Sequence, residues 1–226
     1  QDPIGGIRGN FAMVGIFEKG KADVMFTAKS TGGHASAPGK NTPIARLAAF
    51  VNDTEKHSPF KKKLSPEVAS MFRALAPYAP FGLKLLFGNI WLFRPLLIAV
   101  LPAVSAQAGA MLKTTIAFTT QTGSDACNVI PQKATLGANM RFIPHQGEKE
   151  SLDIIRRCAE KYGLTMEVLH TNDYTEPVDI KGSGYKTVEK VIAETFPDLA
   201  GSPYVMTGAT DAQFNQPICK NCIRFA

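Results

Sequence analysis

One histidine, His34, lies in the segment GGHASAP among glycines and other small residues. Small neighbours allow a substrate or another backbone to approach such a side chain closely. An imidazole in this setting can donate a hydrogen bond to a developing oxyanion. A histidine that only stabilises the turn would have the same neighbours. Spacing alone therefore leaves His34 either as an oxyanion donor or as a turn-stabilising residue.

A second candidate site combines Asn128, in the segment CNVIP, with Arg141, in the segment ATLGANMRF. The two residues flank a tight connection between expected strands, so we expect both to reach one surface. A planar guanidinium on an open sheet face suits a carboxylate, because two parallel hydrogen bonds match its geometry. The alternative is a surface arginine paired with an acidic side chain of the chain itself.

Two further segments contain residue types found in active or metal sites. Residues 208–211, GATD, follow an expected strand, and this pattern is typical both of an active-site rim and of a helix N-cap. Cys219 and Cys222 form a lone CxxC motif. A zinc ribbon needs a second pair, and redox use needs a following helix. We therefore interpret Cys219 and Cys222 as thiols without a metal or redox role.

Complete catalytic signatures are absent from the sequence. It contains no HxD, HExxH or Glu-Glu pair, and no GxGxxG, Walker A or GxSxG motif. Its four histidines, His34, His57, His145 and His170, are far apart in sequence. Nothing in the chain reads as a complete catalytic centre.

Hydrophobic periodicity predicts the elements that position these residues. Strands are expected over residues 9–18, 22–30, 114–122, 134–142 and 164–168, and helices over 43–57 and 148–162. Thr42 is the expected N-cap of the first helix, and Pro43 occupies its first position. Strict alternation in 134–142 places Arg141 on the face opposite the apolar residues.

The order of these elements over residues 22–171 is the ferredoxin-like pattern, a four-stranded antiparallel sheet with both helices on one face. Arg141 then projects from the uncovered face. Six prolines divide residues 59–113 into short helical pieces. Charged residues and a proline interrupt the apolar stretch 81–104, so we expect a packed helical insertion there rather than a transmembrane helix.

The two ends of the chain are expected to form parts of a second domain. A helix over 185–196 and strands over 204–206 and 223–225 join the strand at 9–18. The chain has no initiator methionine and stops after a strand-like run, so we interpret both ends as cuts. The expected fold is α+β, with a unit at 21–175 inserted into a partial α/β domain formed by 1–20 and 176–226.

Composition narrows the classes of partner. The chain has 226 residues and a net charge of +6. A basic balance of this kind makes nucleic acid a partner to consider. The densest basic run is only Lys61–Lys63, and we expect no nucleic acid. A ferredoxin-like RNA-binding domain stacks bases on aromatic side chains of its central strands, but Phe118 and Phe142 fall on the apolar side. Four cysteines without a disulfide pattern fit a reducing compartment, and we expect a cytoplasmic protein.

The chain resembles the dizinc metallopeptidases of the aminoacylase, carboxypeptidase G, succinyl-diaminopimelate desuccinylase and carboxypeptidase S type. Three segments carry the resemblance, in this order: GGHASAPGKNTPIARLA, CNVIPQKATLGANMRF and MTGATDAQF. The resemblance covers nearly the whole chain. The EKG at Glu18–Gly20 and the insertion at 59–113 are most similar to the carboxypeptidase S and N-acyl-amino-acid branch. The resemblance to this family implies a zinc-binding α/β catalytic domain that carries an inserted ferredoxin-like lid, through which two subunits dimerise.

The resemblance also implies roles for individual residues. In the family, two zinc ions hold a bridging water, and a glutamate beside one ligand acts as general base. His34 matches the lid histidine that reaches the zinc site of the partner subunit and stabilises the tetrahedral intermediate. Asn128 and Arg141 match lid residues that hold the substrate, Arg141 by its carboxylate. Thr207 and Gly208 match the rim of the substrate pocket.

The main departure from the family concerns the metal. Its HxD motif, its Asp ligand, its Glu-Glu pair and a later acidic ligand are expected before residue 1, and its final His ligand after residue 226. No zinc ligand is therefore assigned to this chain. Many members also carry arginine where Gln213 stands. We expect a fragment: the lid plus the C-terminal part of the catalytic domain, inactive by itself.

For the parent protein, we expect zinc-dependent hydrolysis of the amide bond of a short peptide or N-acyl amino acid with a free carboxylate. The lid is expected to form a homodimer, and we expect no membrane partner. The alternative is a non-catalytic dimerisation or peptide-binding module.

Overall fold

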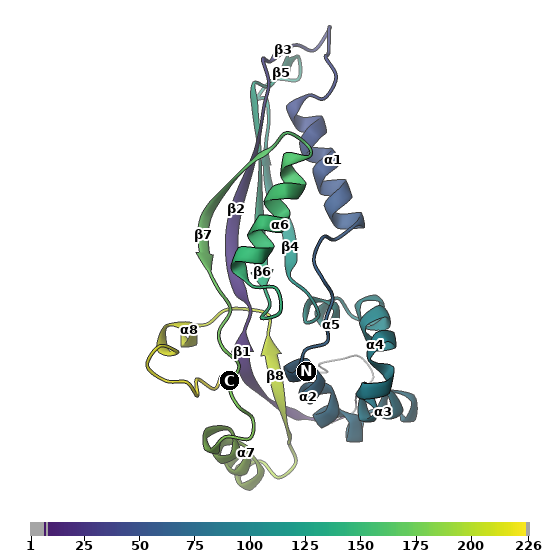
Figure 1. The fold of residues 1–226 in the computed structure, drawn as a ribbon, viewed down its shortest axis with the longest axis vertical. Helices are drawn as coiled ribbons and strands as arrows, with labels where there is room; N and C mark the ends of the chain where they lie inside the picture. The colour runs from purple at the N-terminus through teal and green to yellow at the C-terminus, as the bar shows by residue number, and fades with distance from the viewer. Residues whose placement is uncertain (1–6, 8, 225–226) are drawn as a thin grey trace.

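A four-stranded antiparallel sheet runs along the long axis of the molecule (Figure 1). Its strands are β2 (Gly20–Lys29), β4 (Thr115–Thr122), β6 (Lys133–Phe142) and β7 (Thr165–Asn172), in the order β4-β6-β2-β7. The computed structural model describes residue 7 and residues 9–224. This strand order is that of the ferredoxin-like unit expected from the sequence.

Helices α1 (Pro43–Lys56) and α6 (Glu148–Glu160) pack on one face of this sheet (Figure 1). The alternation predicted for β6 is confirmed, because Ala134, Leu136, Ala138, Met140 and Phe142 are all buried. Phe50 of α1 packs against Phe26 of β2 with ring centroids 4.8 Å apart and the ring planes tilted by 57°. Burying each such ring contributes about 1.5–3 kcal/mol. Pro43 begins α1 as predicted, but Thr42 makes no side-chain cap hydrogen bond.

The aromatic side chains of the central strands belong to this core. Phe142 is fully buried, and Phe118 packs against Phe26 and Phe50. They therefore lie on the helix-covered side of the sheet and not on its open face, where an RNA-binding domain would stack bases.

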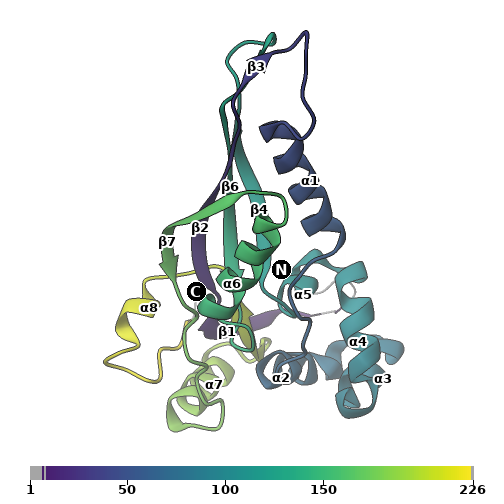
Figure 2. The same cartoon turned by 45° about the horizontal axis from the view of Figure 1, so that its top comes forward.

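The tip of the sheet is a short antiparallel pairing of β3 (Gly33–His34) with β5 (Val129–Ile130), far from the lower part of the molecule (Figures 1 and 2). Gly32 has a φ of +71° and Gly33 a φ of +157°. These values favour glycine, and at Gly32 a Cβ would also lie 2.7 Å from the Gln132 side chain. The glycines of GGHASAP therefore shape the turn that presents His34.

The lower unit contains a parallel pair formed by β1 (Phe11–Glu18) and β8 (Ala200–Met206), with α7 (Ser183–Thr195) and α8 (Ala212–Asn215). The expected strand at 223–225 is wrong for the part that is described. Arg224 forms only an isolated bridge with Gly15, and Phe225 lies outside the described residues. One bridge fixes one residue, whereas a strand needs a continuous ladder.

The helical insertion contains α2 (Pro66–Leu75), the 3₁₀ turn η1 (Ala76–Tyr78), α3 (Phe81–Gly88), α4 (Ile90–Val104) and α5 (Ala106–Ala110). These helices share a hydrophobic core with β1 and β8, in which Phe72 and Leu101 join Phe17 and Val205. By packing, the insertion belongs to the lower unit, although the sequence boundaries place it within 21–175. The apolar face of α2 covers the β1–β8 pair, and this contact places the insertion in the lower unit.

The insertion is packed as expected on the side that shares a core with β1 and β8, but the other side of α3 and α4 is exposed. Phe81 is 84% exposed and Trp91 is 76% exposed. Among the described residues, no single helix is long and apolar enough to cross a membrane. Only α3 and α4 taken together have the required length and hydropathy, and they are bent by 116°.

The chain passes between the upper and lower units four times, and we call these crossings the neck: residues 18–20, 57–65, 111–115 and 173–175. Buried polar groups tie the crossings together. Lys19 Nζ donates to the carbonyl oxygens of Ala110 and Lys113, each at 2.9 Å. Thr175 Oγ1 accepts from the backbone N–H of Glu18 at 2.8 Å.

The side chain and backbone of Gln146 join the remaining crossing, 57–65, to the crossing at 111–115. Its Oε1 accepts from Lys61 N at 3.0 Å, and its carbonyl accepts from Thr114 Oγ1 at 3.0 Å. At Gly20, a Cβ would lie 2.7 Å from the backbone of Asp173 and Tyr174, so glycine allows the first and last crossings to touch. The neck is therefore a closely packed junction rather than a pair of loose linkers.

Replacing Lys19 with methionine is expected to remove a pH dependence of stability. Burial, followed by the charges of Arg141 and Lys113, lowers the pKa of Lys19 from 10.5 to about 7. Between these values the unfolded chain binds a proton that the folded chain does not, so the free energy of unfolding rises with pH. Chemical denaturation at about pH 7.5 and about pH 9.5 should show a smaller rise for the variant.

Lys21→Met is the matched control, since Lys21 is part-exposed and pairs with Asp23 at 2.9 Å. Equal pH slopes for wild type and Lys19→Met would contradict the assignment of this titration to Lys19.

Candidate functional site

The tip brings together two of the residues singled out from the sequence. His34 is the register partner of Val129, and Asn128 O accepts a hydrogen bond from Ala35 N at 2.9 Å. Both His34 and Asn128 are exposed. We call His34 and Asn128 the tip pair.

The imidazole of His34 is oriented by its own turn. Its Nδ1 accepts from the backbone N–H of Ser36 at 3.2 Å and lies 2.7 Å from Ser36 Oγ. A backbone N–H can only donate, so Nδ1 of the neutral ring is the acceptor and Nε2 carries the proton. His34 therefore presents an N–H donor from the tip, which is the group that an oxyanion requires.

The expectation that Asn128 and Arg141 reach one surface is wrong within a single chain. Arg141 lies at the neck end of β6, as the register partner of Lys21 and Thr115. The strand from Lys133 to Arg141 spans about 26 Å at about 3.3 Å per residue, and Asn128 lies beyond its other end. Side-chain alternation predicted the face that Arg141 occupies, but not the end of the sheet.

Three neighbouring side chains position the guanidinium of Arg141 on the open face. Its Nε donates to Asn139 Oδ1 at 3.0 Å, and Asn139 Nδ2 donates in turn to Asp23 Oδ1 at 2.6 Å. Hydrogen bonds from Asn139 and then from Lys21 hold the pKa of Asp23 below its ordinary value. Asp23 stays ionised and fixes the amide, so that its oxygen faces Arg141.

None of the ion pairs in the described part of the chain includes Arg141. The alternative of a surface arginine paired with a carboxylate of the same chain is therefore not what the structure contains. Because Asn139 occupies Nε, the Nη groups are available for the bidentate fork that a carboxylate accepts. Lys21, the register partner of Arg141, adds positive charge to this end of the sheet.

The loop after β8 carries Thr207 and Gly208, and it also lies at the neck. Met206 O accepts from Lys19 N at 3.0 Å, which places the start of the loop beside the first crossing. Gly208 is exposed and Thr207 is half-buried. Asp211 occupies the N-cap position of α8 but makes no side-chain cap bond. Arg141, Thr207 and Gly208 thus lie at the same end of the sheet, and we call them the neck group.

Glu18 holds this loop in place, and the sequence analysis missed that role. Its side chain is 1% exposed and accepts from Thr210 N at 3.0 Å and from Thr210 Oγ1. Arg224 Nε donates at 2.9 Å to Oε1, the oxygen that also accepts from Thr210 Oγ1. A sequence pattern could have indicated the Glu18–Arg224 ion pair: each of these opposite charges ends an apolar run, GIFE and CIR.

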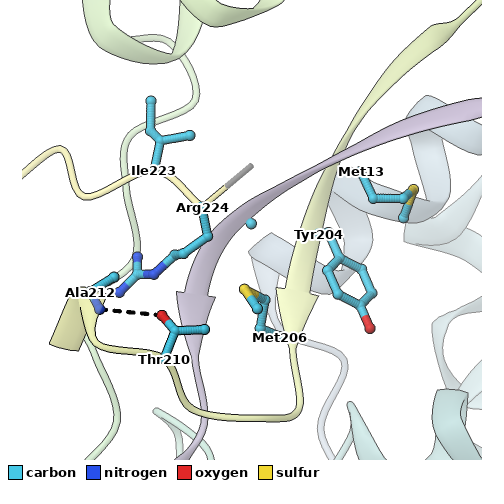
Figure 3. Close-up of a pocket in the computed structure, with 8 residues that line it drawn as sticks. Met13, Tyr204, Met206, Thr210, Ala212, Ile223 and Arg224 are labelled. Carbon is cyan, nitrogen blue, oxygen red and sulfur yellow. Dashed lines mark hydrogen bonds between the residues drawn. The ribbon is translucent and has the colours of Figure 1, made fainter. Parts of the chain in front are cut away.

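A cavity of about 470 Å³ opens beside this ion pair (Figure 3). Its lining includes Met13, Tyr204, Met206, Ile223 and Arg224. The guanidinium of Arg224 points toward Thr210 and Ala212 (Figure 3), and Ala212 N donates to Thr210 Oγ1 at 3.3 Å. The wall is largely apolar, and its charged group is already engaged with Glu18.

A model of the peptidase dimerisation domain family matches residues 16–167, which is more than half of the chain. The chain belongs to the M20 metallopeptidase family. The matched region begins in β1 and ends within β7, so it contains strands β2, β4 and β6 of the sheet, the start of β7, the tip and the insertion.

Curated M20 relatives extend the match over nearly the full sequence. The chain is 32% identical over 226 residues to the N-fatty-acyl-amino acid synthase/hydrolase PM20D1 of Xenopus tropicalis, covering 99% of this chain and 44% of that protein. It is 27% identical to the probable carboxypeptidase S-like 2 of Dictyostelium discoideum, covering 97% of this chain and 42% of that protein. The chain spans less than half the length of these relatives.

Solved M20 structures share the fold at low sequence identity. The metallo-carboxypeptidase Sso-CP2 from Sulfolobus solfataricus superposes with a TM-score of 0.58 at 16% identity, covering 91% of this chain and 56% of that one. Human carnosine dipeptidase 1 gives a TM-score of 0.56 at 14% identity, covering 94% of this chain and 49% of that one. These likenesses support the mixed α/β fold.

M20 metallopeptidases are typically zinc dependent, but the residues described here do not fit a zinc site. No group of three or more His, Cys, Asp or Glu side chains that could hold a metal lies within residues 9–224. The four cysteines are free thiols, and Cys222 Sγ only donates to the Cys219 carbonyl oxygen at 3.0 Å. Gln213 carries an amide where many relatives are expected to have arginine, and it makes no contact that assigns it a role.

Proposed function

We propose that the protein containing this chain hydrolyses the amide bond of an N-acyl amino acid or short peptide with a free carboxylate. Membership of the M20 family carries the proposal, and the hydrolase names of its curated relatives support it. Because the residues present do not form a zinc site, we propose that the metal ligands come from polypeptide outside this sequence. This chain alone is then inactive.

The dimer is the second part of the proposal. The tip pair and the neck group lie at opposite ends of the sheet, so one chain cannot apply both to the same small substrate. A second copy, arranged so that its tip reaches the neck of the first, would complete the site. The match to a dimerisation domain supports this arrangement. In it, the ferredoxin-like unit acts as the lid.

In this composite site, each residue has one task. Arg141 binds the substrate carboxylate through its Nη groups, held in position by Asn139. The partner subunit's His34 donates from Nε2 to the oxyanion that develops as the amide bond breaks. Asn128 of the partner holds the substrate beside it, and Thr207 and Gly208 form the rim. The free cysteines support a reducing compartment such as the cytoplasm.

Arg141→Lys is expected to weaken the binding of free-acid substrates, because lysine lacks the planar fork. Steady-state hydrolysis of N-acyl amino acids should show a raised KM with a smaller change in kcat. The same substrates with amidated C-termini should be affected little. Equal losses on acid and amide substrates would contradict the carboxylate role.

The proposal as a whole is tested by amino acid release from N-acyl amino acids and dipeptides, with and without a metal chelator. The assay uses the intact protein with its flanking sequence. Absence of metal-dependent release, together with retained dimerisation or peptide binding, would favour the non-catalytic module instead.

A further inference from the structure

The outer side of α3 and α4 is apolar and exposed. Phe81 and Leu85 lie one turn apart on α3, and Leu92, Leu96 and Val100 lie one turn apart on α4. Trp91 is 76% exposed beside them. We call these six residues the α3–α4 apolar face. A surface helix in contact with water normally carries polar residues at such positions.

The segment that forms this face carries charges of one sign. Residues 68–124 contain Arg73, Lys84, Arg94 and Lys113 and not one aspartate or glutamate. Lys84 lies on α3 between Phe81 and Leu85, and Arg94 lies on α4 between Trp91 and Leu96. An exposed apolar face whose own helices carry only basic charged residues is complementary to a layer of hydrocarbon beneath anionic headgroups.

A hollow of about 250 Å³ lies next to the face, lined by Arg73, Arg94, Trp91 and Ile90 among others. Arg94 Nη2 donates to Leu64 O at 2.6 Å, which fixes the guanidinium at this position. Arg73 is exposed at the same hollow. Two positively charged guanidiniums attract an anionic headgroup. The indole beside them fits the same location, because tryptophan prefers the membrane–water boundary.

We propose that the α3–α4 apolar face docks the protein on the surface of an anionic phospholipid bilayer. The apolar side chains enter the acyl boundary, and Arg73, Lys84 and Arg94 contact the headgroup layer. Helices α3 and α4 lie on the opposite side of the lower unit from α8 (Figures 1 and 2). Docking therefore leaves the loop at Thr207 and Gly208 exposed. This departs from the expectation of no membrane partner, because the structure leaves Phe81 and Trp91 uncovered.

Trp91 provides the test, because it is the only tryptophan in the sequence. The intact protein is mixed with vesicles of phosphatidylcholine alone or with phosphatidylglycerol added, and co-flotation is measured. Trp91 emission is taken as the difference between the wild type and Trp91→Phe, since the flanking sequence can contain further tryptophans. We expect a blue shift and co-flotation with the anionic vesicles, both weakened by salt. Leu96→Ser should lower vesicle affinity about tenfold or more, the scale of burying one leucine.

Two variants separate the parts of the surface. Lys84→Gln should weaken binding to anionic vesicles and leave neutral vesicles unaffected. Ile218→Ser is the matched control, because Ile218 is 86% exposed and lies away from α3 and α4. It should bind vesicles as the wild type does.

Three results would overturn the proposal. Trp91 emission that is already blue-shifted without lipid, and unchanged by vesicles, would mean that another part of the polypeptide covers the face. A fall in molecular mass for Leu96→Ser in solution, with no vesicle binding by the wild type, would make the face an interface between copies. Equal vesicle binding by Leu96→Ser and Ile218→Ser would place lipid contact elsewhere.

Discussion

Replacing Arg224 with methionine is expected to lower the free energy of unfolding by about 3–5 kcal/mol, because it leaves a buried carboxylate without its cation. Glu18 and Arg224 have side chains only 1% and 5% exposed, and Nε lies 2.9 Å from Oε1. Chemical denaturation measures the loss. Among the described residues, Thr210 alone would remain as a hydrogen-bond partner of the Glu18 carboxylate, so the loop after β8 should also loosen.

Two comparisons make this prediction specific to the buried pair. The double variant Glu18→Leu with Arg224→Met removes both charges and should recover most of the lost stability. Lys186→Ala breaks the exposed pair with Glu189 on α7 and should cost about 0–1 kcal/mol. An Arg224→Met cost no larger than that of Lys186→Ala would contradict the structural role assigned to the pair.

His34→Ala is expected to lower kcat of the intact protein by about 10²–10³, the scale of losing one oxyanion donor. KM should change less, because the proposed hydrogen bond strengthens in the transition state. His57→Ala is the matched control, since His57 is an exposed histidine that pairs with Asp53 at the end of α1. An unchanged kcat for His34→Ala would remove His34 from the proposed mechanism.

Mixed dimers test whether His34 acts across subunits. His34→Ala and Arg141→Ala subunits, each inactive alone, should regain activity when they are mixed and allowed to exchange. About a quarter of the sites should be intact, since about half of the dimers are mixed and each has one complete site. No recovery, with exchange verified by mass, would contradict a site that two chains share.

Local pattern predicted much of the upper unit. The period-two alternation of 134–142 fixed which side chains of β6 are buried, and glycine chemistry indicated the turn around His34. The same pattern could not say that Asn128 and Arg141 lie at opposite ends of the sheet. Alternation reports a face, and only the pairing of β5 with β3 and of β6 with β2 decides position along the sheet.

Contacts between distant parts of the chain account for the other differences. Glu18 and Arg224 are separated by 206 residues, so neither neighbourhood reveals the other. The insertion packs on β1 and β8 because α2 has an apolar face. Which strands that face contacts depends on tertiary packing and not on the local sequence. Composition also showed that α3 and α4 are apolar, but it could not show which side of them stays uncovered.

The neck described above bears on how the molecule moves. A domain joined by two strands of chain can swing when a few backbone angles change. Here four passages are braced by Lys19, Gln146 and Thr175, and Gly20 touches the last of them. We expect the tip and the lower unit to move together as one rigid body. Opening and closing around a substrate would then have to come from one subunit sliding or rotating against the other.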